Sequence, residues 1–430
     1  MGWGGDAIRD LGFVISRRGR EDGGVGSKGD ELEQWGADVI FGRRKGLGAF
    51  VARIVLRWLS FVYGFIVRLR LRAYRQHWKE QSRLGTMVIS VGNLTVGGTG
   101  KTPVVEFLSR TLRDRGRRVA VLSRGYKSKK LDAVQQWQDW DYESCEELPK
   151  IVSDGTEVRL DAKYAGDEPF MLAKNLPGVS VIVDKNRVNG GRFAVTELGA
   201  DTLILDDGLQ YLQLEHEIDI VLVDQNAPFG TRALLPRGTL REPMRNLCRA
   251  SYIIITKAQG PTDEALLARM RKYNPAAEII ETTHGPKYLQ QVFGEERLPL
   301  DALDGKYVAA ISGIAVPESF EGLLDKLGAK VEFHRTFADH HAFEQREVDR
   351  FMHRCVERDI EMIVTTEKDS VRFPRPKELD VDVYFLRIEI EILKGREVWE
   401  RLIDRIADRR ERAPAGWAEE RLLLDPLGAE

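Results

Sequence analysis

Short apolar runs rich in Val and Ile recur through the first two thirds of the chain. They span residues 87–91, 119–122, 179–183, 203–205, 218–223 and 252–255. Because several of these runs lack polar alternation, they predict strands buried on both faces of a parallel sheet. Helical patterns lie between some of them, for example at residues 103–115 and 263–273. The pattern predicts an α/β fold with a doubly wound, mostly parallel sheet, which binds ligands at the carboxyl ends of its strands.

The last third of the chain predicts a second, smaller α/β domain. Strand patterns occur at residues 308–311, 331–334, 362–365 and 383–386, and helical patterns at 317–327, 344–358 and 395–409. The irregular, acidic stretch 127–156 is expected to be a long excursion or a lid. We therefore expect a flexible extension at residues 1–46, a helix at 47–80, a main domain at 81–300, a smaller domain at 301–412 and a mobile tail at 413–430.

The segment 51–79 predicts an amphipathic helix. Basic and small residues fall on one stripe of a helical wheel, and aromatic and aliphatic residues such as Trp58 and Phe65 fill most of the rest. Its longest uncharged run, residues 58–67, is shorter than the roughly twenty residues that a spanning helix needs. Such a helix suits a membrane interface, and it equally suits packing against the protein's own core with a solvated face.

The most informative segment is residues 89–103, an apolar strand that passes into a glycine-rich loop ending in Gly-Lys-Thr. Such a loop offers backbone N–H groups and a helix N-terminus to a polyphosphate. Lys101 would reach the terminal phosphates, and the Thr102 hydroxyl would complete the shell of a Mg²⁺. A structural strand-to-helix turn is the alternative, but it has no need of Lys101. The predicted nucleotide-binding residues are Thr95, Val96, Gly97, Gly98, Thr99, Gly100, Lys101 and Thr102.

Composition narrows the range of functions. The net charge of -2 over 430 residues gives no basic excess, so nucleic acid is not an expected partner. Cys145, Cys248 and Cys355 lie far apart and fit neither a disulfide framework nor a metal site, which favours a reducing, cytosolic environment. No secretory signal is visible at the N-terminus. Nothing in the sequence indicates an obligate protein partner.

Adjacent carboxylates follow the predicted strand 203–205. Asp206 and Asp207 stand where a P-loop protein places an aspartate that holds Mg²⁺ or its waters. The same pair could instead cap the next turn. With the glycine-rich loop present, the metal role is favoured, although the sequence does not indicate which carboxylate faces the ion.

Three further segments carry candidate chemistry, each with a structural alternative. Asp167, which precedes Glu168 and Pro169, suits either a helix start or a role in catalysis. His340, between a strand and a helix, suits either a surface cap or a base brought across an interdomain cleft. Arg241, with Arg237 and Arg245 nearby, suits either an anion-binding loop or a solvated turn.

Together these segments resemble the lipid A 4′-kinase (tetraacyldisaccharide 4′-kinase) family. The resemblance covers about residues 56 to 404, in the family's order, and a threonine at position 95 is usual in that family. The matching segments are SVGNLTVGGTGKTP at 90–103, SRGY at 123–126, GDEP at 166–169, DDGLQ at 206–210, LREP at 240–243, DH at 339–340 and TEKD at 366–369.

This resemblance implies transfer of the ATP γ-phosphoryl group, with Mg²⁺, to the 4′-hydroxyl of a tetraacyldisaccharide 1-phosphate, giving lipid IVA. It implies a P-loop domain joined to a smaller α/β domain, with the active site between them. Asp167 and His340 would form a dyad that activates the sugar hydroxyl. Lys101 would offset charge on the transferring group. The residues implied to hold phosphate or sugar are Arg187, Arg241 and Glu242.

The implied substrate also bears on the predicted helix 47–80. Because the acyl chains of the lipid disaccharide lie in a bilayer, the resemblance favours docking of this helix on a membrane surface. The implied location is the cytoplasmic face of the bacterial inner membrane, with the protein peripheral or monotopic.

Two other classes remain to be weighed. A membrane-associated P-loop ATPase that positions protein partners would also have a basic amphipathic helix. Many such ATPases carry an early lysine in the loop where this chain has Val96, which argues against that class. A nucleotide-binding structural module leaves the segments around Asp167 and His340 unexplained.

Overall fold

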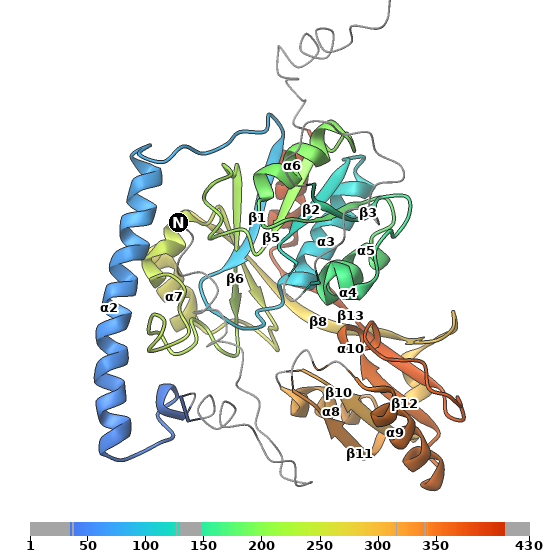
Figure 1. Ribbon diagram of the computed structural model, residues 1–430. Helices are drawn as coiled ribbons and strands as arrows, with labels where there is room; N and C mark the ends of the chain where they lie inside the picture. The colour runs from blue at the N-terminus through green and yellow to red at the C-terminus, as the bar shows by residue number, and fades with distance from the viewer. Residues whose placement is uncertain are drawn as a thin grey trace, which may run out of the picture. The chain divides into compact units, whose positions relative to one another are not determined.

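The computed structural model describes residues 35–36, 38–125, 128–129, 148–314, 316–338, 341 and 343–408. Two compact units are present, and each is described by itself (Figure 1). Unit 1 comprises the described parts of residues 1–76, 93–104 and 221–394, and unit 2 those of 77–92, 105–220 and 395–430. The units are assembled from separated stretches of sequence, unlike the expected continuous domains at 81–300 and 301–412. The expected domain boundaries stay a prediction.

Unit 2 is built on a sheet in the order β1-β5-β2-β4-β3. The strands are parallel except for β3, which runs antiparallel to β4. The strands are β1 (Met87–Asn93), β2 (Val119–Ser123), β3 (Lys150–Asp154), β4 (Ser180–Val183) and β5 (Thr202–Asp206). The helices are α3 (Lys101–Asp114), α4 (Ala162–Ala165), α5 (Asp167–Asn175), α6 (Arg187–Thr196) and α11 (Arg396–Ala407). The first four residues of α3 and the last residue of β1 group with unit 1.

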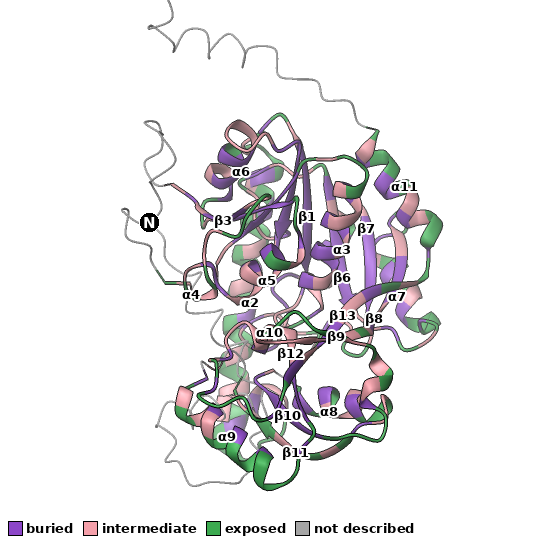
Figure 2. Ribbon diagram, turned by 90° about the vertical axis from the view of Figure 1, so that its right-hand side faces the viewer, coloured by how far each residue is buried: buried purple, intermediate pink, exposed green. Residues whose placement is uncertain are grey.

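Both faces of this sheet are buried, as the unbroken apolar runs predict (Figure 2). Leu203 and Leu205 of β5 pack in one cluster with Phe193 of α6. Ile204 lies between them in sequence and is also fully buried, so it faces the opposite side of the pleated sheet. Helices on both faces are the condition under which such strands are stable.

The C-terminal helix α11 packs on α3 within unit 2. The rings of Phe107 and Trp399 stack at 4.7 Å between centroids. Arg115 at the end of α3 pairs with Glu400 at 2.9 Å and with Asp404 at 2.5 Å. The helix expected to close the smaller C-terminal domain therefore packs on the helix that follows the glycine-rich loop.

The strands of unit 1 are mixed in direction and are hydrogen-bonded in the order β11-β10-β12-β13-β8-β7-β6. β10 is parallel to β11 and β12, β12 to β13, and β7 to β8. β8 is antiparallel to β13 and to β9. The strands are β6 (Ile218–Asp224, which begins in unit 2), β7 (Tyr252–Thr256), β8 (Glu278–Gln291), β9 (Arg297–Leu298), β10 (Tyr307–Ser312), β11 (Lys330–Thr336), β12 (Met362–Thr366) and β13 (Val383–Lys394). The α/β fold with a mostly parallel sheet is confirmed.

Helices complete unit 1. They are α2 (Leu47–Arg75), η3 (Met244–Arg249), α7 (Glu264–Tyr273), η4 (Leu300–Leu303), α8 (Pro317–Lys326), α9 (Gln345–Glu357) and α10 (Glu367–Ser370). Local signals explain several starts. Pro317 opens α8, and α9 begins with a capping box between Glu344 and Glu347.

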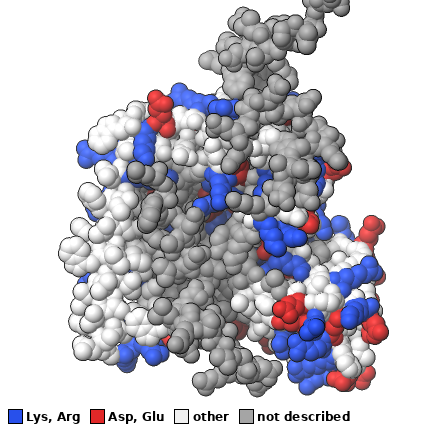
Figure 3. Space-filling view, viewed as in Figure 1, with Lys and Arg blue, Asp and Glu red and all other residues white. Residues whose placement is uncertain are grey.

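α2 buries few residues, most of them small in its first two thirds, and leaves most of its large apolar residues exposed. Its buried positions are Ala49, Ser60, Gly64, Leu71 and Tyr74. The exposed fraction reaches 70% for Trp58 and 66% for Phe61. The exposed large apolar side chains are Leu47, Phe50, Val51, Ile54, Val55, Trp58, Leu59, Phe61, Val62, Phe65, Ile66 and Leu69. In Figure 3 the surface over α2 is mainly uncharged, with basic residues near its two ends.

The bounds of α2 differ from the expectation in one respect. The helix ends at Arg75 rather than near residue 79 or 80. By length and composition it qualifies as a candidate membrane span, with a window of mean hydropathy 1.7 of which 6% is buried. The uncharged run 58–67 alone did not indicate this, because the apolar stretch continues N-terminally past Arg57 and Arg53.

The sequence patterns did not predict every strand. β8 was not predicted, because it mixes polar residues with Gly285 and Pro286; its long pairing with β13 supplies what local propensity does not. β3 lies at the end of the stretch expected to be irregular, and most of that stretch (residues 126–127 and 130–147) lies outside the described residues. β13 also continues to Lys394, beyond the expected end at residue 386.

Candidate functional site

The glycine-rich loop joins the carboxyl end of β1 to α3, which begins at Lys101. Gly97 and Gly100 have φ angles of 108° and 79°, a backbone region that glycine enters without steric cost. The Thr99 N–H donates to the Gly97 carbonyl at 3.1 Å, which closes a tight turn. A side chain added at Gly98 would meet no atom within 4 Å, so open space adjoins the loop.

Residues at the ends of β6 and β7 hold the loop's carbonyl oxygens. The Thr256 hydroxyl donates to the Thr99 carbonyl at 2.7 Å. The Lys257 ammonium donates to the Gly98 carbonyl at 2.6 Å and pairs with Asp224 at 2.7 Å. Because carbonyl dipoles repel anions, binding them on this side leaves the loop suited to an anionic ligand.

His284 of β8 supports the loop by packing. A methyl group added at Gly100 would lie 2.8 Å from the His284 imidazole, so only glycine fits there. Burial, followed by the nearby charge of Lys257, lowers the pKa of His284 to about 4, while Asp224 opposes the shift. The imidazole is therefore neutral beside the loop near neutral pH.

Asn93, where β1 passes into the loop, contacts both Lys101 and Arg241. The Lys101 ammonium lies 3.4 Å from Asn93 Oδ1, and the Asn93 amide donates to the Thr95 hydroxyl at 3.2 Å. The buried Arg241 guanidinium donates to the Asn93 carbonyl at 3.3 Å and to Asn93 Oδ1. Arg241 therefore contacts Asn93, the last residue of β1 before the glycine-rich loop, which its sequence context did not indicate.

Glu242 is buried within a local network. Its carboxylate accepts from the Asn246 amide at 2.7 Å and from Arg249 at 2.8 Å. Both partners belong to η3, so Glu242 fixes this short helix to the segment that carries Arg241.

In unit 2 the structure brings Asp206, Asp207 and Arg187 together. Asp206 is in register with Val91 of β1, two residues before the loop begins. Its carboxylate accepts from the Ser123 hydroxyl at 3.4 Å, and its carbonyl accepts from Arg187 at 3.3 Å. Asp207 has a φ of 54°, which is costly for a residue other than glycine.

Arg187 begins α6 and is buried. Its guanidinium lies over the Tyr211 ring, 5.0 Å from the centroid. Burial lowers its pKa, while Asp207 and Asp206 oppose this shift. The Arg187 guanidinium is a buried positive charge beside the two negative charges of Asp206 and Asp207. Such clusters of buried charged groups are frequent at functional sites.

The donor set of Asp206 and Asp207 fits Mg²⁺. Among the residues that the structure describes, no group of three or more His, Cys, Asp or Glu side chains could hold a metal ion. Mg²⁺ is usually bound by one or two carboxylates together with waters and substrate phosphates. A pair of carboxylates at a strand end is compatible with this mode of binding.

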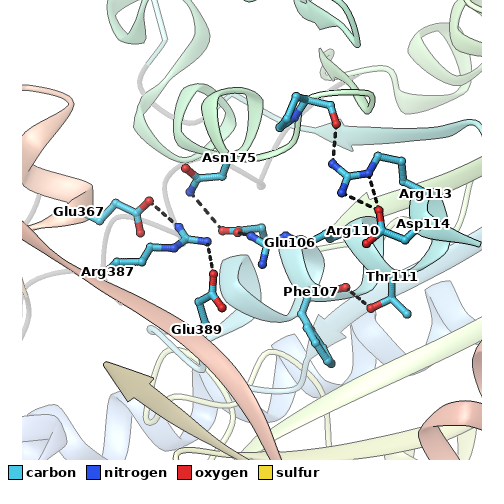
Figure 4. A network of polar contacts seen from close by, with 11 residues as sticks. Glu106, Phe107, Arg110, Thr111, Arg113, Asp114, Asn175, Glu367, Arg387 and Glu389 are labelled. Carbon is cyan, nitrogen blue, oxygen red and sulfur yellow. Dashed lines mark hydrogen bonds and ion pairs between the residues drawn. The ribbon is translucent and has the colours of Figure 1, made fainter. Parts of the chain in front are cut away.

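Asp167 is the first residue of α5, whose N-cap is Gly166. The helix-start interpretation is thus confirmed as local structure, and a carboxylate in the first turn is favourable there. The far end of α5 is tied to α3, because Asn175 donates to Glu106 at 3.2 Å (Figure 4). The catalytic role of Asp167 stays a prediction.

His340 lies outside the described residues, as does Asp339. The next residue, His341, contacts Glu347 at 2.8 Å, and its carbonyl accepts from Arg372 at 2.8 Å. Arg372 pairs in turn with the buried Asp369, which also accepts from the Gly313 N–H at 2.8 Å.

The TEKD segment at 366–369 is thus a structural anchor in unit 1. Besides the contacts of Asp369, Glu367 accepts from the buried Arg387 at 2.6 Å, and Arg387 also reaches Glu389 (Figure 4). Two carboxylates around one guanidinium neutralise its charge in a buried position.

Sequence reasoning missed Asp224, Lys257 and His284. The first two follow apolar strands in the same way as Asp206, so the strand-end rule offered a signal. His284 sits in the unpredicted strand β8, and nothing in its sequence context marked it.

A strand-to-helix loop of this shape, with a lysine at the first helical residue, defines the class of P-loop nucleotide-binding proteins. Residues 52–407 match the family model Tetraacyldisaccharide-1-P 4'-kinase, and the chain belongs to this family.

Relatives and a solved structure agree. A protein of Halothermothrix orenii named Tetraacyldisaccharide 4'-kinase is 35% identical over 382 residues, which cover 85% of this chain and 95% of that protein. One of Anaeromyxobacter sp. (strain Fw109-5) with the same name is 41% identical over 320 residues, 74% of this chain and 81% of that protein. A crystal structure described as an "apo" form of LpxK from Aquifex aeolicus in complex with ATP matches with a TM-score of 0.63 at 29% identity, and covers 83% of this chain and 99% of that one.

The buried His284 predicts a pH dependence of stability. Its folded-state pKa of about 4 lies below the ordinary 6.5, so between these values the unfolded chain takes up a proton that the folded chain does not. The free energy of unfolding contributed by this group is fully present above pH 6.5 and falls by about 3 kcal/mol as the pH drops to 4.

We expect His284→Gln to lose this part of the pH dependence, measured by urea unfolding at pH 7.5, 6, 5 and 4. The exposed His353 offers a matched control, and His353→Gln should follow the wild-type curve. Equal slopes for His284→Gln and wild type would contradict the prediction.

Proposed function

We propose that the chain transfers the γ-phosphoryl group of ATP to the 4′-hydroxyl of a tetraacyldisaccharide 1-phosphate, forming lipid IVA in lipid A biosynthesis. The observation that carries this proposal is the glycine-rich loop, which Lys257 holds at the Gly98 carbonyl and which ends in Lys101. It occurs in a chain whose residues 52–407 match the kinase family. ATP would bind with its phosphates on the loop and on the first turn of α3.

The roles of the loop and the strand-end carboxylates follow from this assignment. Residues 95–102 would bind the polyphosphate, with Lys101 as its point charge. Thr102, Asp206 and Asp207 would hold Mg²⁺, which offsets charge on the phosphates when bound.

Asp167 and His340 are proposed as the dyad that activates the acceptor. A sugar hydroxyl is a poor nucleophile near neutral pH, so a positioned base must remove its proton as it attacks phosphorus. An imidazole can accept this proton, and a carboxylate can orient and stabilise the imidazolium that forms.

Arg187 is proposed to hold phosphate or sugar, since it is a buried cation beside Asp206 and Asp207. The contacts of Arg241 and Glu242 with Asn93 and Arg249 favour action through the position of the loop segment that they stabilise.

We also propose that α2 docks on the cytoplasmic face of the inner membrane. Its outward face carries aromatic and aliphatic side chains that remain exposed in the folded chain, such as Trp58 and Phe61. Burial of such a side chain in lipid is worth about 2 kcal/mol. Exposed arginines on the helix, including Arg57, Arg72 and Arg75, suit contact with anionic headgroups.

The kinase assignment is tested with purified protein, γ-labelled Mg-ATP and disaccharide 1-phosphate in mixed micelles. Wild type should label the lipid. Lys101→Ala should lower kcat/KM by about 100-fold or more, because it removes charge at the transferring group. Lys326→Ala, at an exposed lysine of α8, is the control. ATP hydrolysis without labelled lipid would instead favour a membrane-associated ATPase that positions protein partners.

The dyad predicts non-additive losses in that assay. Asp167→Ala and His340→Ala should each lower kcat severely, and the double variant should cost little more, because either change disables one catalytic unit. The decisive quantity is the ratio of kcat values around the double-mutant cycle. Multiplying losses would mean that the two residues act independently.

The docking proposal predicts weaker binding to vesicles when the outward face of α2 is truncated. Trp58→Ala with Phe61→Ala should weaken sedimentation with vesicles containing anionic phospholipid by about tenfold or more. Val356→Ala removes an exposed apolar side chain from α9 and should bind as wild type. Unchanged binding of the double variant would show that this face is not the docking surface.

A further inference from the structure

Two hydroxyl groups on the inward side of α2 bind main-chain carbonyls of the segment 234–241. The Ser60 hydroxyl donates to the Leu234 carbonyl, and the Tyr63 hydroxyl donates to the Arg241 carbonyl, each at 2.9 Å. Gly64 lies close against Leu234, since an added methyl group would be 2.7 Å from its side chain. α2 is therefore fastened to the backbone of this segment, and its apolar face is left outside.

The same segment pairs with the first arm of the phosphate-binding loop. The Arg241 N–H donates to the Leu94 carbonyl, and the Val96 N–H donates to the Thr239 carbonyl, each at 2.8 Å. Thr95 and Leu240 form an antiparallel bridge. Main-chain hydrogen bonds on both sides of this bridge mean that the segment and the loop arm move together.

Side chains continue the connection to the lysine of the loop. The Arg241 guanidinium donates to the carbonyl and the side-chain oxygen of Asn93, and the same oxygen lies 3.4 Å from the Lys101 ammonium. A contiguous series of contacts thus runs from Tyr63 through Arg241 and Asn93 to Lys101, all within unit 1.

We propose that Tyr63, Arg241 and Asn93 are positioning residues for Lys101, and that through them α2 sets the geometry of the phosphate-binding loop. This proposal rests on the proposed kinase function and on docking of α2 at a lipid surface. A lysine that stabilises a transferring phosphoryl group must be held accurately, because a misplacement of about 1 Å can cost on the order of 100-fold in rate.

A purely structural role for these hydroxyls makes a different prediction. If Ser60 and Tyr63 only fasten the helix, their loss changes stability or vesicle binding and leaves the nucleotide kinetics alone. If they position Lys101, their loss changes the nucleotide kinetics and is coupled to the effect of Asn93.

The test uses full-length protein and the Tyr63→Phe variant, which removes one hydroxyl. Tyr74→Phe removes a hydroxyl from the second tyrosine of α2, which is buried, and is the control. We expect Tyr63→Phe to bind vesicles of anionic phospholipid as wild type does, while kcat/KM for Mg-ATP falls by about three- to tenfold. Tyr74→Phe should match wild type in both measurements.

Asn93→Ala completes a double-mutant cycle. We expect a larger loss for Asn93→Ala alone and little further loss on adding Tyr63→Phe, because both changes interrupt one series of contacts. Wild-type kinetics for Tyr63→Phe, or losses that multiply with those of Asn93→Ala, would overturn the proposal. Should Tyr63→Phe unfold, Ser60→Ala takes its place in the same cycle.

Titration with Mg-ATP alone separates this proposal from the proposed function. If wild type labels no lipid, the kinase assignment fails, and the positioning role is then decided by the affinity for Mg-ATP. An affinity lowered by Tyr63→Phe and not by Tyr74→Phe supports the connection. Equal affinities of both variants and wild type overturn it.

Discussion

The glycine-rich loop can receive an anion on its amides only if its carbonyl oxygens are kept away from that anion. The fold meets this requirement from two directions within unit 1. Thr256 and Lys257, at the end of β7, take the carbonyls of Thr99 and Gly98. Arg241 takes the carbonyl of Asn93 where the loop begins. The glycines allow the turn, but these donors decide which side of the loop faces a ligand.

α2 has the opposite arrangement from a helix of a soluble core. Small and hydroxylic residues such as Ser60 and Gly64 face the protein, and large apolar residues face away. Small residues let the helix approach the segment 234–241 closely, and the hydroxyls satisfy carbonyls of that segment. The wheel pattern alone could not distinguish this from core packing, because it shows that two faces differ and not which one meets the protein.

Much of the fold could be read from unbroken apolar runs, because strands buried on both faces leave a strong local signal. β8 left none, since its register is set by a distant partner, β13. The sequence motif also predicted the position of the glycine-rich loop, of Lys101 at its end and of Asp206 at the end of a strand. The contacts of Arg241 with Asn93 and of His284 with Gly100 did not, because each joins segments far apart in sequence. The position of Asp167 at the start of α5 does not indicate whether it has a catalytic role.

The return of α11 to α3 bears on how the chain is made. Phe107 and Arg115 find their partners only at Trp399, Glu400 and Asp404. During synthesis, nearly the whole chain must leave the ribosome before this side of α3 is covered. Because each unit is assembled from separated stretches of sequence, neither is complete when the first half of the chain has emerged. Until then the growing chain exposes the apolar surface of α3 that α11 covers in the folded chain.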